Sequence, residues 1–229
     1  MPYARGVCTI VVWALWWALN SAPASGAEIG AETLSLPDAW AEAAYATPAE
    51  DRLATFTKLA ERARKTTDEN SADALIWKGI CLGSLAGERR SIGSLKVARE
   101  ARGALLASIK LDDRAMEGAA HVSLGAMYYR LPPWPVSFGS KKKARRALKR
   151  ALEISPTSMD ANYFMADFLF TVGETSTARS HVEMGLSAPI RPGRELADRG
   201  RQEELMRLLE KIDAAQASKT KAGNALPSR

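Results

Sequence analysis

The chain has 229 residues and a formal net charge of +6, with 46% hydrophobic and 25% charged residues. These proportions exclude an intrinsically disordered chain and suit one domain or one compact array of repeats. The excess of basic residues fits an acidic protein, an anionic ligand or a negative membrane surface as partner, unless it only aids solubility.

Residues 1–27 follow the order of a secretory signal peptide. Arg5 gives a positive start, residues 7–19 are uncharged and apolar, and residues 25–27 are small, as a signal peptidase requires. We therefore predict that residues 1–27 are removed and that the protein is periplasmic. An N-terminal membrane anchor is the alternative, although the apolar run is shorter than the roughly 20 residues that a bilayer needs.

The two cysteines are Cys8 and Cys81. Removal of the signal peptide leaves Cys81 alone, so no internal disulfide can form and the mature fold relies on its apolar core. Cys81 lies within an apolar helical pattern, and we predict a buried, inert thiol rather than a reactive one.

The chain beyond residue 28 has a helical pattern, because apolar residues recur at spacings of three and four and no strand pattern stands out. We expect Thr47, Ser71 and Ser140 to cap helices, since their hydroxyl groups can accept a bond from a free backbone N–H. The polar end at 218–229 contains glycine and proline and is predicted to be disordered. Turn residues divide the rest into helices at 37–46, 48–65, 72–86, 95–111, 114–131, 141–154, 159–172, 175–187 and 195–217.

An internal repeat runs through these helices. Ala144 and Ala178 stand 34 residues apart on helices with the same apolar pattern, and this is the period of a tetratricopeptide repeat (TPR). Ala101 occupies the same position on an earlier helix, and the longer spacing from it to Ala144 coincides with an insertion at 132–138. Small residues are needed at these points because they let two helix axes approach closely.

We therefore predict an all-α, TPR-like array of antiparallel helix pairs, coiled as a right-handed superhelix. The helical domain spans residues 28–217. A set of unrelated amphipathic helices is the alternative, but it does not account for three alanines in one frame. The clear repeat units cover 72–113, 115–156 and 159–188, and the helix at 195–217 caps the array.

The inserted loop has an unusual composition. Its three prolines stiffen it, and it carries the large apolar residues Trp134 and Phe138. A loop seldom exposes such residues without cause. They either fold back to fill a gap between helices or form a rim over a binding surface, and the two roles are compatible.

Three short motifs lie in and after this loop: Pro133-Trp134-Pro135, Phe138-Gly139 and Asn162-Tyr163-Phe164. With the segments upstream, they resemble a family of exported bacterial TPR proteins that includes the T component associated with tripartite ATP-independent periplasmic (TRAP) transporters. The resemblance covers about residues 72–210, although the lipoprotein cysteine of some members is missing. It implies a periplasmic helical array with a cavity for a ligand or a protein, and a substrate-binding protein of a transporter as one partner.

In a TPR array the first helix of each pair lines the concave face, where a mixed surface buries apolar groups and orients them with a few polar contacts. An acid on this face needs a partner, and Arg130 is the candidate for Asp167. The candidate binding residues on this face and in the loop are Tyr129, Arg130, Trp134, Phe138, Tyr163, Asp167 and Phe170. The other inward positions are Asp73, Ile76, Ile80, Gly83, Ser84, Ala119, Val122, Ala126, Asp160 and Thr171.

Residues 141–150 (KKKARRALKR) hold seven basic residues in ten. The apolar residues of this helix form one buried stripe, so the charges cover its outer face. A solvated face is the simplest interpretation, and docking on an anionic headgroup or an acidic protein is the alternative.

Signals of catalysis are weak. His121 lies at a packing position, and the H-x-E run at His181 lacks the Cys-x-x-Cys motif of a zinc deaminase. No nucleophile elbow, phosphate loop or metal cluster is evident in the sequence, so we expect no enzyme activity, cofactor or metal, and no nucleic acid partner. The sequence favours a module that binds a protein or a small ligand. An assembly protein that oligomerises through its helices, and a hydrolase with an unrecognised site, are the alternatives.

Overall fold

A computed structural model of the protein describes residues 34–89, 91 and 93–224, with side chains up to Ser218. The predicted signal peptide at 1–27, its alternative as a membrane anchor, and residues 225–229 lie outside the described residues. Within the described part, no helix combines the length and the apolar character of a membrane span. Every feature below belongs to one compact unit, Leu36–Arg229.

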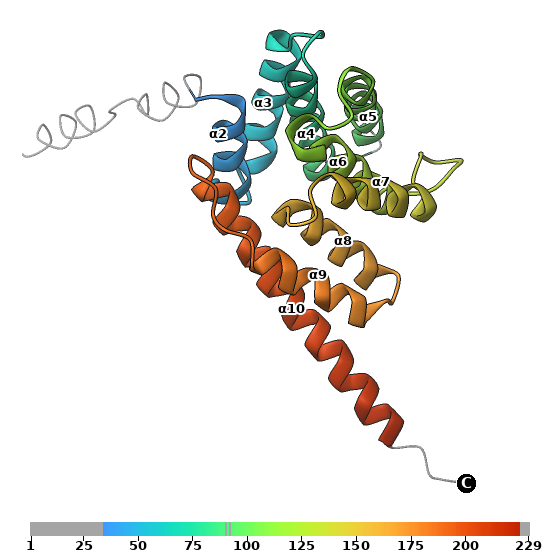
Figure 1. Ribbon diagram of the computed structural model, residues 1–229. Helices are drawn as coiled ribbons and strands as arrows, with labels where there is room; N and C mark the ends of the chain where they lie inside the picture. Colours follow the sequence, from blue (N-terminus) through green and yellow to red (C-terminus); the bar gives the residue numbers. More distant parts are fainter. Residues whose placement is uncertain (1–33, 90, 92, 225–229) are drawn as a thin grey trace, which may run out of the picture. The chain divides into compact units, whose positions relative to one another are not determined.

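The prediction of an all-helical protein is confirmed for the described residues. They contain no strand, and a single isolated bridge joins Pro133 to Gly139. In chain order the elements are α2 (Leu36–Ala41), the π-helix η1 (Glu42–Ala46), α3 (Arg52–Thr66), α4 (Ala72–Glu88), α5 (Ser94–Leu111), α6 (Ala115–Arg130), α7 (Lys141–Ile154), α8 (Met159–Thr171), α9 (Thr175–Leu186) and α10 (Glu195–Asn224) (Figure 1).

Serine hydroxyl groups open three of these helices. Ser71 opens α4 and Ser140 opens α7, as predicted, and Ser158 opens α8. Each Oγ accepts a hydrogen bond from the backbone N–H three residues later, at 3.2–3.3 Å. These bonds satisfy donors that have no partner inside the helix.

The prediction that Thr47 caps the next helix is wrong. Its hydroxyl donates over 3.0 Å to the carbonyl of Glu42, the first residue of η1, and α3 begins only at Arg52. The reason is a separate turn at 48–51, in which the N–H groups of Asp51 and Arg52 donate to the Pro48 carbonyl.

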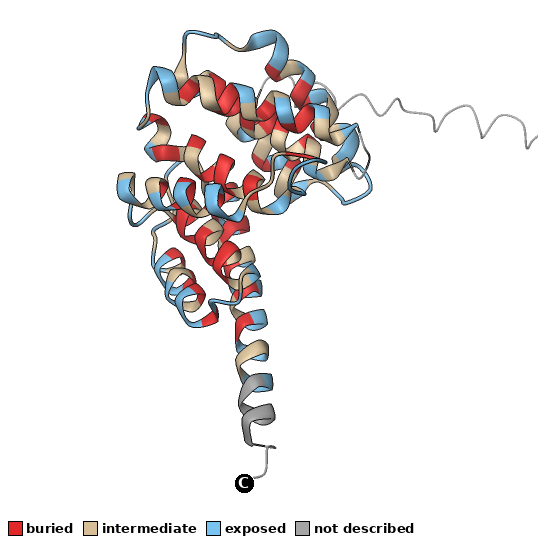
Figure 2. Cartoon of the chain, turned by 90° about the vertical axis from the view of Figure 1, so that its right-hand side faces the viewer, coloured by how far each residue is buried: buried red, intermediate tan, exposed pale blue. Residues whose placement is uncertain are grey.

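The helices pack in neighbouring pairs, α4 with α5, α6 with α7 and α8 with α9, which follow one another along the chain (Figure 1). Ala101, Ala144 and Ala178 lie on the second helix of each pair and are fully buried, as the repeat frame predicts. Figure 2 shows the buried residues gathered on the faces that the helices turn toward one another. The core is therefore continuous along the array.

Close contact within these pairs depends on glycine. Gly79 of α4 faces Leu105 of α5, and Gly125 of α6 faces Leu148 of α7. A Cβ atom added to Gly79 would lie 2.5 Å from Leu105 Cγ, and one added to Gly125 would lie 2.6 Å from Leu148 Cγ. Both leucines stand four residues after a repeat alanine, so the contact recurs in the predicted frame. In the third pair the corresponding residues are the buried Ala166 and Val182.

The last helix, α10, packs on α9 and α8 and also contacts η1 near the beginning of the unit. Gly185 of α9 faces Leu205, and Gly200 faces the ring of Tyr45 with no room for a Cβ atom between them. The array therefore curls until its first and last elements touch.

The predicted end of the capping helix at Ala217 is wrong, because α10 continues to Asn224. Residues 218–224 of the predicted disordered tail therefore belong to α10. This segment contains lysine and alanine, which favour helix, and the next proline after it is Pro227. A polar composition by itself does not end a helix.

We expect Gly79→Ala and Gly125→Ala each to lower the free energy of unfolding by about 1–3 kcal/mol, because the added methyl group displaces a packed leucine. Gly103 supplies the matched control, since it lies mid-helix in α5 with open space around a Cβ atom. Gly103→Ala should raise stability by up to about 1 kcal/mol. Urea unfolding followed by circular dichroism measures all three; equal effects at Gly79 and Gly103 would contradict the packing described above.

Candidate functional site

The curled array encloses a cavity of about 610 Å³ on its inner side. The walls come from α2 and η1, from the first helix of each pair, from Ala98 of α5, and from α10 and the segment that leads into it. Eight of the fifteen inward positions of the repeat frame line this cavity. The predicted concave residues that line the cavity are Ile80, Gly83, Ser84, Ala119, Val122, Ala126, Arg130 and Asp160.

Aromatic side chains form one wall of the cavity. Trp40 and Tyr45 pack edge to face with ring centroids 5.8 Å apart, and the Trp77 ring lies 6.4 Å from that of Trp40. The indole N–H of Trp40 donates to Ser84 Oγ at 2.8 Å, which fixes the ring. A rigid aromatic wall of this kind suits the apolar body of a ligand.

Four arginines line the same cavity: Arg130, Arg191, Arg194 and Arg201. Arg201 is buried, and its guanidinium lies 4.4 Å from the centroid of the Tyr163 ring. Its Nε donates to Asp160 at 2.8 Å, so an ion pair joins α10 to α8. Arg201 therefore acts as a structural cation.

Asp160 also binds a second arginine. Arg191 Nη2 lies 3.1 Å from Asp160 and 2.5 Å from the fully buried Asp198, which also accepts the backbone N–H of Arg191. Burial acts to raise the pKa of Asp160, but Arg201 and Arg191 outweigh it and hold that pKa below its ordinary value. The carboxylate is therefore charged at neutral pH.

The prediction that Arg130 is the partner of Asp167 is confirmed. Arg130 Nη2 lies 2.6 Å from Asp167 Oδ2, and the Tyr129 hydroxyl donates to the same oxygen at 2.5 Å. Burial raises the pKa of Tyr129, so its hydroxyl stays protonated and remains a donor. This cluster ties α6 to α8 at one edge of the cavity.

Arg194 differs from the other three arginines. Its guanidinium lies 5.3 Å from the centroid of the Trp77 ring, and no carboxylate of the described residues pairs with it. Its Nε is buried and has no hydrogen-bond partner. A buried donor on a cation costs free energy when it is left unpaired, and a bound anion would satisfy it.

Of the seven predicted binding residues, Arg130 lines the cavity and the other six do not. Tyr129 and Asp167 belong to the cluster with Arg130 described above. Tyr163 lies beneath the Arg201 guanidinium, and Phe170 is half-buried against the core. Phe138 packs back against α6, whereas Trp134 is 84% exposed at the loop. Phe138 therefore fills a gap against α6, as the first predicted role of the loop requires. Trp134 does not fold back and stays exposed.

Two residues of the cavity wall have an unusual backbone conformation. Met116 and Glu117 have φ angles of 46° and 56°, in the left-handed region that favours glycine, and Gly118 follows at 79°. Met116 and Glu117 both line the cavity. Backbone strain of this kind persists only where the surrounding structure holds it, and it is concentrated at ligand sites.

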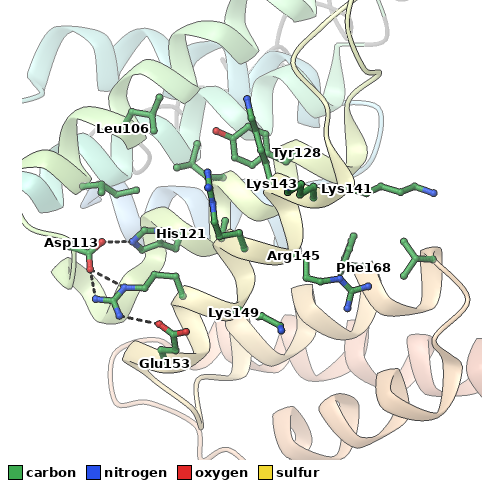
Figure 3. A pocket seen from close by; sticks show the side chains of 17 residues that line it. Leu106, Asp113, His121, Tyr128, Lys141, Lys143, Arg145, Lys149, Glu153 and Phe168 are labelled. Atoms are coloured by element: carbon green, nitrogen blue, oxygen red, sulfur yellow. Dashed lines mark hydrogen bonds and ion pairs between the residues drawn. The ribbon is translucent and has the colours of Figure 1, made fainter.

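A second hollow of about 940 Å³ lies along α7 and is also lined by residues of α5, α6 and α8 (Figure 3). Lysines of α7 lie on its border, among them Lys141, Lys143 and Lys149. At one end Asp113 accepts bonds from His121 at 2.7 Å and from Arg150 at 2.5 Å. The two hydrogen bonds hold the pKa of Asp113 below its ordinary value.

Two side chains that could act as a nucleophile or a general base, Cys81 and His181, are buried or hydrogen-bonded within the fold. Burial raises the pKa of Cys81 to about 12, as expected for an inert thiol. His181 bonds to Asn162 at 2.9 Å, and burial lowers its pKa. In the part of the chain with described side chains, no three His, Cys, Asp or Glu residues are grouped so as to hold a metal ion.

A scan against models of protein families gives no match to this chain, and a search of curated proteins also gives none.

We expect Asp160→Asn to lower the free energy of unfolding at neutral pH by about 3 kcal/mol, because it removes one of the two carboxylates that pair with the buried Arg201 and one of the two that pair with Arg191. Since the folded state depresses the pKa of Asp160, this stabilisation is present above the unfolded pKa, near 4, and is lost as pH falls through the folded pKa. The gap between wild type and variant therefore narrows below about pH 4. Urea unfolding over a pH series tests this.

Glu203→Gln is the control for this series. Glu203 pairs with Arg207 on the exposed side of the same helix, α10, where water screens the charges. We expect this variant to match the wild type at every pH. If the difference in free energy of unfolding between wild type and Asp160→Asn stays constant as the pH falls, the role given to the Asp160 carboxylate is wrong.

Proposed function

We propose that the protein is an exported TPR-type binding protein that takes a small ligand with an apolar body and an anionic group into its inner cavity. The observation that carries this proposal is Arg194, a cation without an acidic partner that lies over Trp77 in the cavity wall. The aromatic wall would hold the apolar body, and Arg194 would pair with the anionic group.

The size of the cavity supports a small ligand over a protein segment. Its volume of about 610 Å³ falls within the range of about 300–1,000 Å³ that small-molecule sites occupy. The paired arginines favour the same conclusion, because their charges are already neutralised by Asp160, Asp167 and Asp198. Of the four lining arginines, Arg194 is the one that pairs with no carboxylate of the described residues.

The TPR assignment and the cellular location remain proposals as well. The 34-residue spacing from Ala144 to Ala178, and the buried alanines on three second helices, support a right-handed TPR superhelix. The N-terminal sequence pattern supports export to the periplasm. The resemblance to the T component of TRAP transporters supports a substrate-binding protein of such a transporter as partner.

An assembly function is the second candidate, and α10 is the observation that favours it. Among the side chains of α10 that the structure describes, Ile212 is the last fully buried one, yet the helix continues to Asn224 (Figure 1). Isolated helical segments of this length are marginal in water unless a partner covers them. Light scattering coupled to size exclusion, over a range of concentrations, would detect an oligomer formed through this helix.

The ligand proposal is tested with 4-phenylbutanoate and its neutral amide, titrated by calorimetry. We expect the acid to bind about tenfold more tightly than the amide, since the charged pair with Arg194 forms only with the acid. Arg194→Gln should remove this difference and leave binding of the amide unchanged. Mass spectrometry of small molecules released from the purified protein should detect organic acids with wild type only.

Arg199→Gln is the matched control, because Arg199 is exposed on α10. It should bind both compounds as the wild type does. Equal affinity for acid and amide in the wild type would contradict an anion site at Arg194. If neither compound binds and no small molecule is released, the small-ligand proposal is wrong and a protein partner is favoured.

A further inference from the structure

A loop and a helix on the outer side of the array form a surface that the cavity does not use. The loop is 132–139, and the helix is α7 with its exposed cations; together they are called the α7 surface below. Figure 1 shows the loop beside the first turn of α7. None of the loop residues and none of the α7 residues lines the cavity.

The loop presents two apolar side chains to solvent from a fixed base. Trp134 is 84% exposed and Val136 is 56% exposed. At the base, the N–H of Gly139 donates to the Pro132 carbonyl at 3.0 Å, and Phe138 packs against α6. The base is anchored and prolines stiffen the chain. Trp134 and Val136 are therefore exposed in the folded conformation of the loop. Exposed apolar groups of this size mark an interaction site.

Most cations of α7 have no acidic partner. Arg145 pairs with Glu174, and Arg150 pairs with Asp113 and Glu153. Within the described part of the chain, no ion pair involves Lys141, Lys142, Lys143, Arg146 or Lys149. Three of these, Lys142, Arg146 and Lys149, repeat at helical spacing on the face opposite the buried stripe.

The stability of the helix does not explain this arrangement. Lys141, Lys142 and Lys143 stand in the first turn of α7, which contains no acidic residue, at the positive end of the helix dipole. Lys142 and Arg146 are like charges four residues apart, a spacing that destabilises a helix. An external anionic surface would offset both the repulsion between the lysines and the helix dipole and the repulsion between Lys142 and Arg146.

We propose that the α7 surface docks on an anionic phospholipid membrane, with Trp134 and Val136 in the headgroup region and the lysines facing the phosphates. Tryptophan favours the membrane interface because it has an apolar body and a polar N–H. Basic residues gain attraction from anionic lipids near the surface. The hollow beside α7 offers lipid phosphates a basic border (Figure 3).

A membrane accounts for the whole surface better than an acidic protein does. Acidic side chains would pair with the cations, but the loop tip would then need a matching apolar pocket on the partner. Trp134 and Val136 can insert anywhere along a bilayer surface, because its interfacial region is continuous and needs no preformed pocket. The attraction would also be screened by salt, which gives the test a second readout.

The test is flotation of the full chain with vesicles of phosphatidylcholine alone or mixed with phosphatidylglycerol. The readout is the ratio of binding to anionic and neutral vesicles, because the uncharged segment at 7–19 cannot create a preference for anionic lipid. We expect the wild type to prefer the anionic vesicles by about tenfold or more at low salt, and less at high salt. Lys142→Glu/Arg146→Glu/Lys149→Glu should abolish this preference.

The charge-matched control reverses three exposed lysines elsewhere, Lys65→Glu/Lys96→Glu/Lys211→Glu, and should keep most of the preference. Trp134→Phe tests the loop by a spectroscopic route. Brominated lipids should quench tryptophan emission more in the wild type than in this variant, and the difference reports Trp134 alone.

Two results would overturn the proposal: equal binding of the wild type to both kinds of vesicle, or an unchanged ratio in the α7 triple variant. Emission from Trp134 that is not quenched would exclude the loop from the membrane. Capture by poly-glutamate beads without binding to anionic vesicles would assign the α7 surface to an acidic protein instead. The test does not involve Arg194 or the cavity, so its failure leaves the ligand proposal standing.

Discussion

The whole fold depends on neighbouring helices approaching one another where no side chain stands between them. Gly79 and Gly125 each face a leucine of the next helix, and Gly185 faces Leu205 of α10. A leucine seated on a glycine fixes both the distance and the angle between two helices. The same contact in successive pairs repeats the same small rotation, and repeated rotation curves an array toward one side. The inner cavity is a consequence of this curvature.

Closure of the array decides what kind of site the cavity can be. Tyr45 of η1 lies against Gly200 of α10, and its hydroxyl donates to Glu204 at 3.4 Å. This contact brings Arg194 and Arg201, from the end of the chain, to the aromatic residues from its beginning. An open array would offer a long groove to a protein segment. An array whose ends touch borders a cavity of limited volume, with a cation next to an aromatic ring.

Local rules predicted the helices and about half of the concave residues, because each helix carries its own apolar period and serine hydroxyl groups cap three of them. The pair formed by Arg130 and Asp167 also followed from the repeat frame, since adjacent first helices face each other. The frame could not predict that Trp40 and Arg194 lie in the same cavity as Trp77. Their meeting depends on the rotation accumulated over every pair, and no short segment of sequence specifies that sum. The same limit applies to Tyr163, which the repeat frame places on the concave face but which lies behind Arg201 and does not line the cavity.

The distribution of charge follows from where water can reach. Inside the cavity an unpaired charge is costly, so three of the lining arginines are neutralised by carboxylates of α8 and α10. On the outer face of α7, water screens the lysines, and a group of unpaired cations is tolerated. A single unpaired cation inside and a cluster outside therefore have different meanings. The first fits one anionic group of a small ligand, and the second fits a surface that carries many charges.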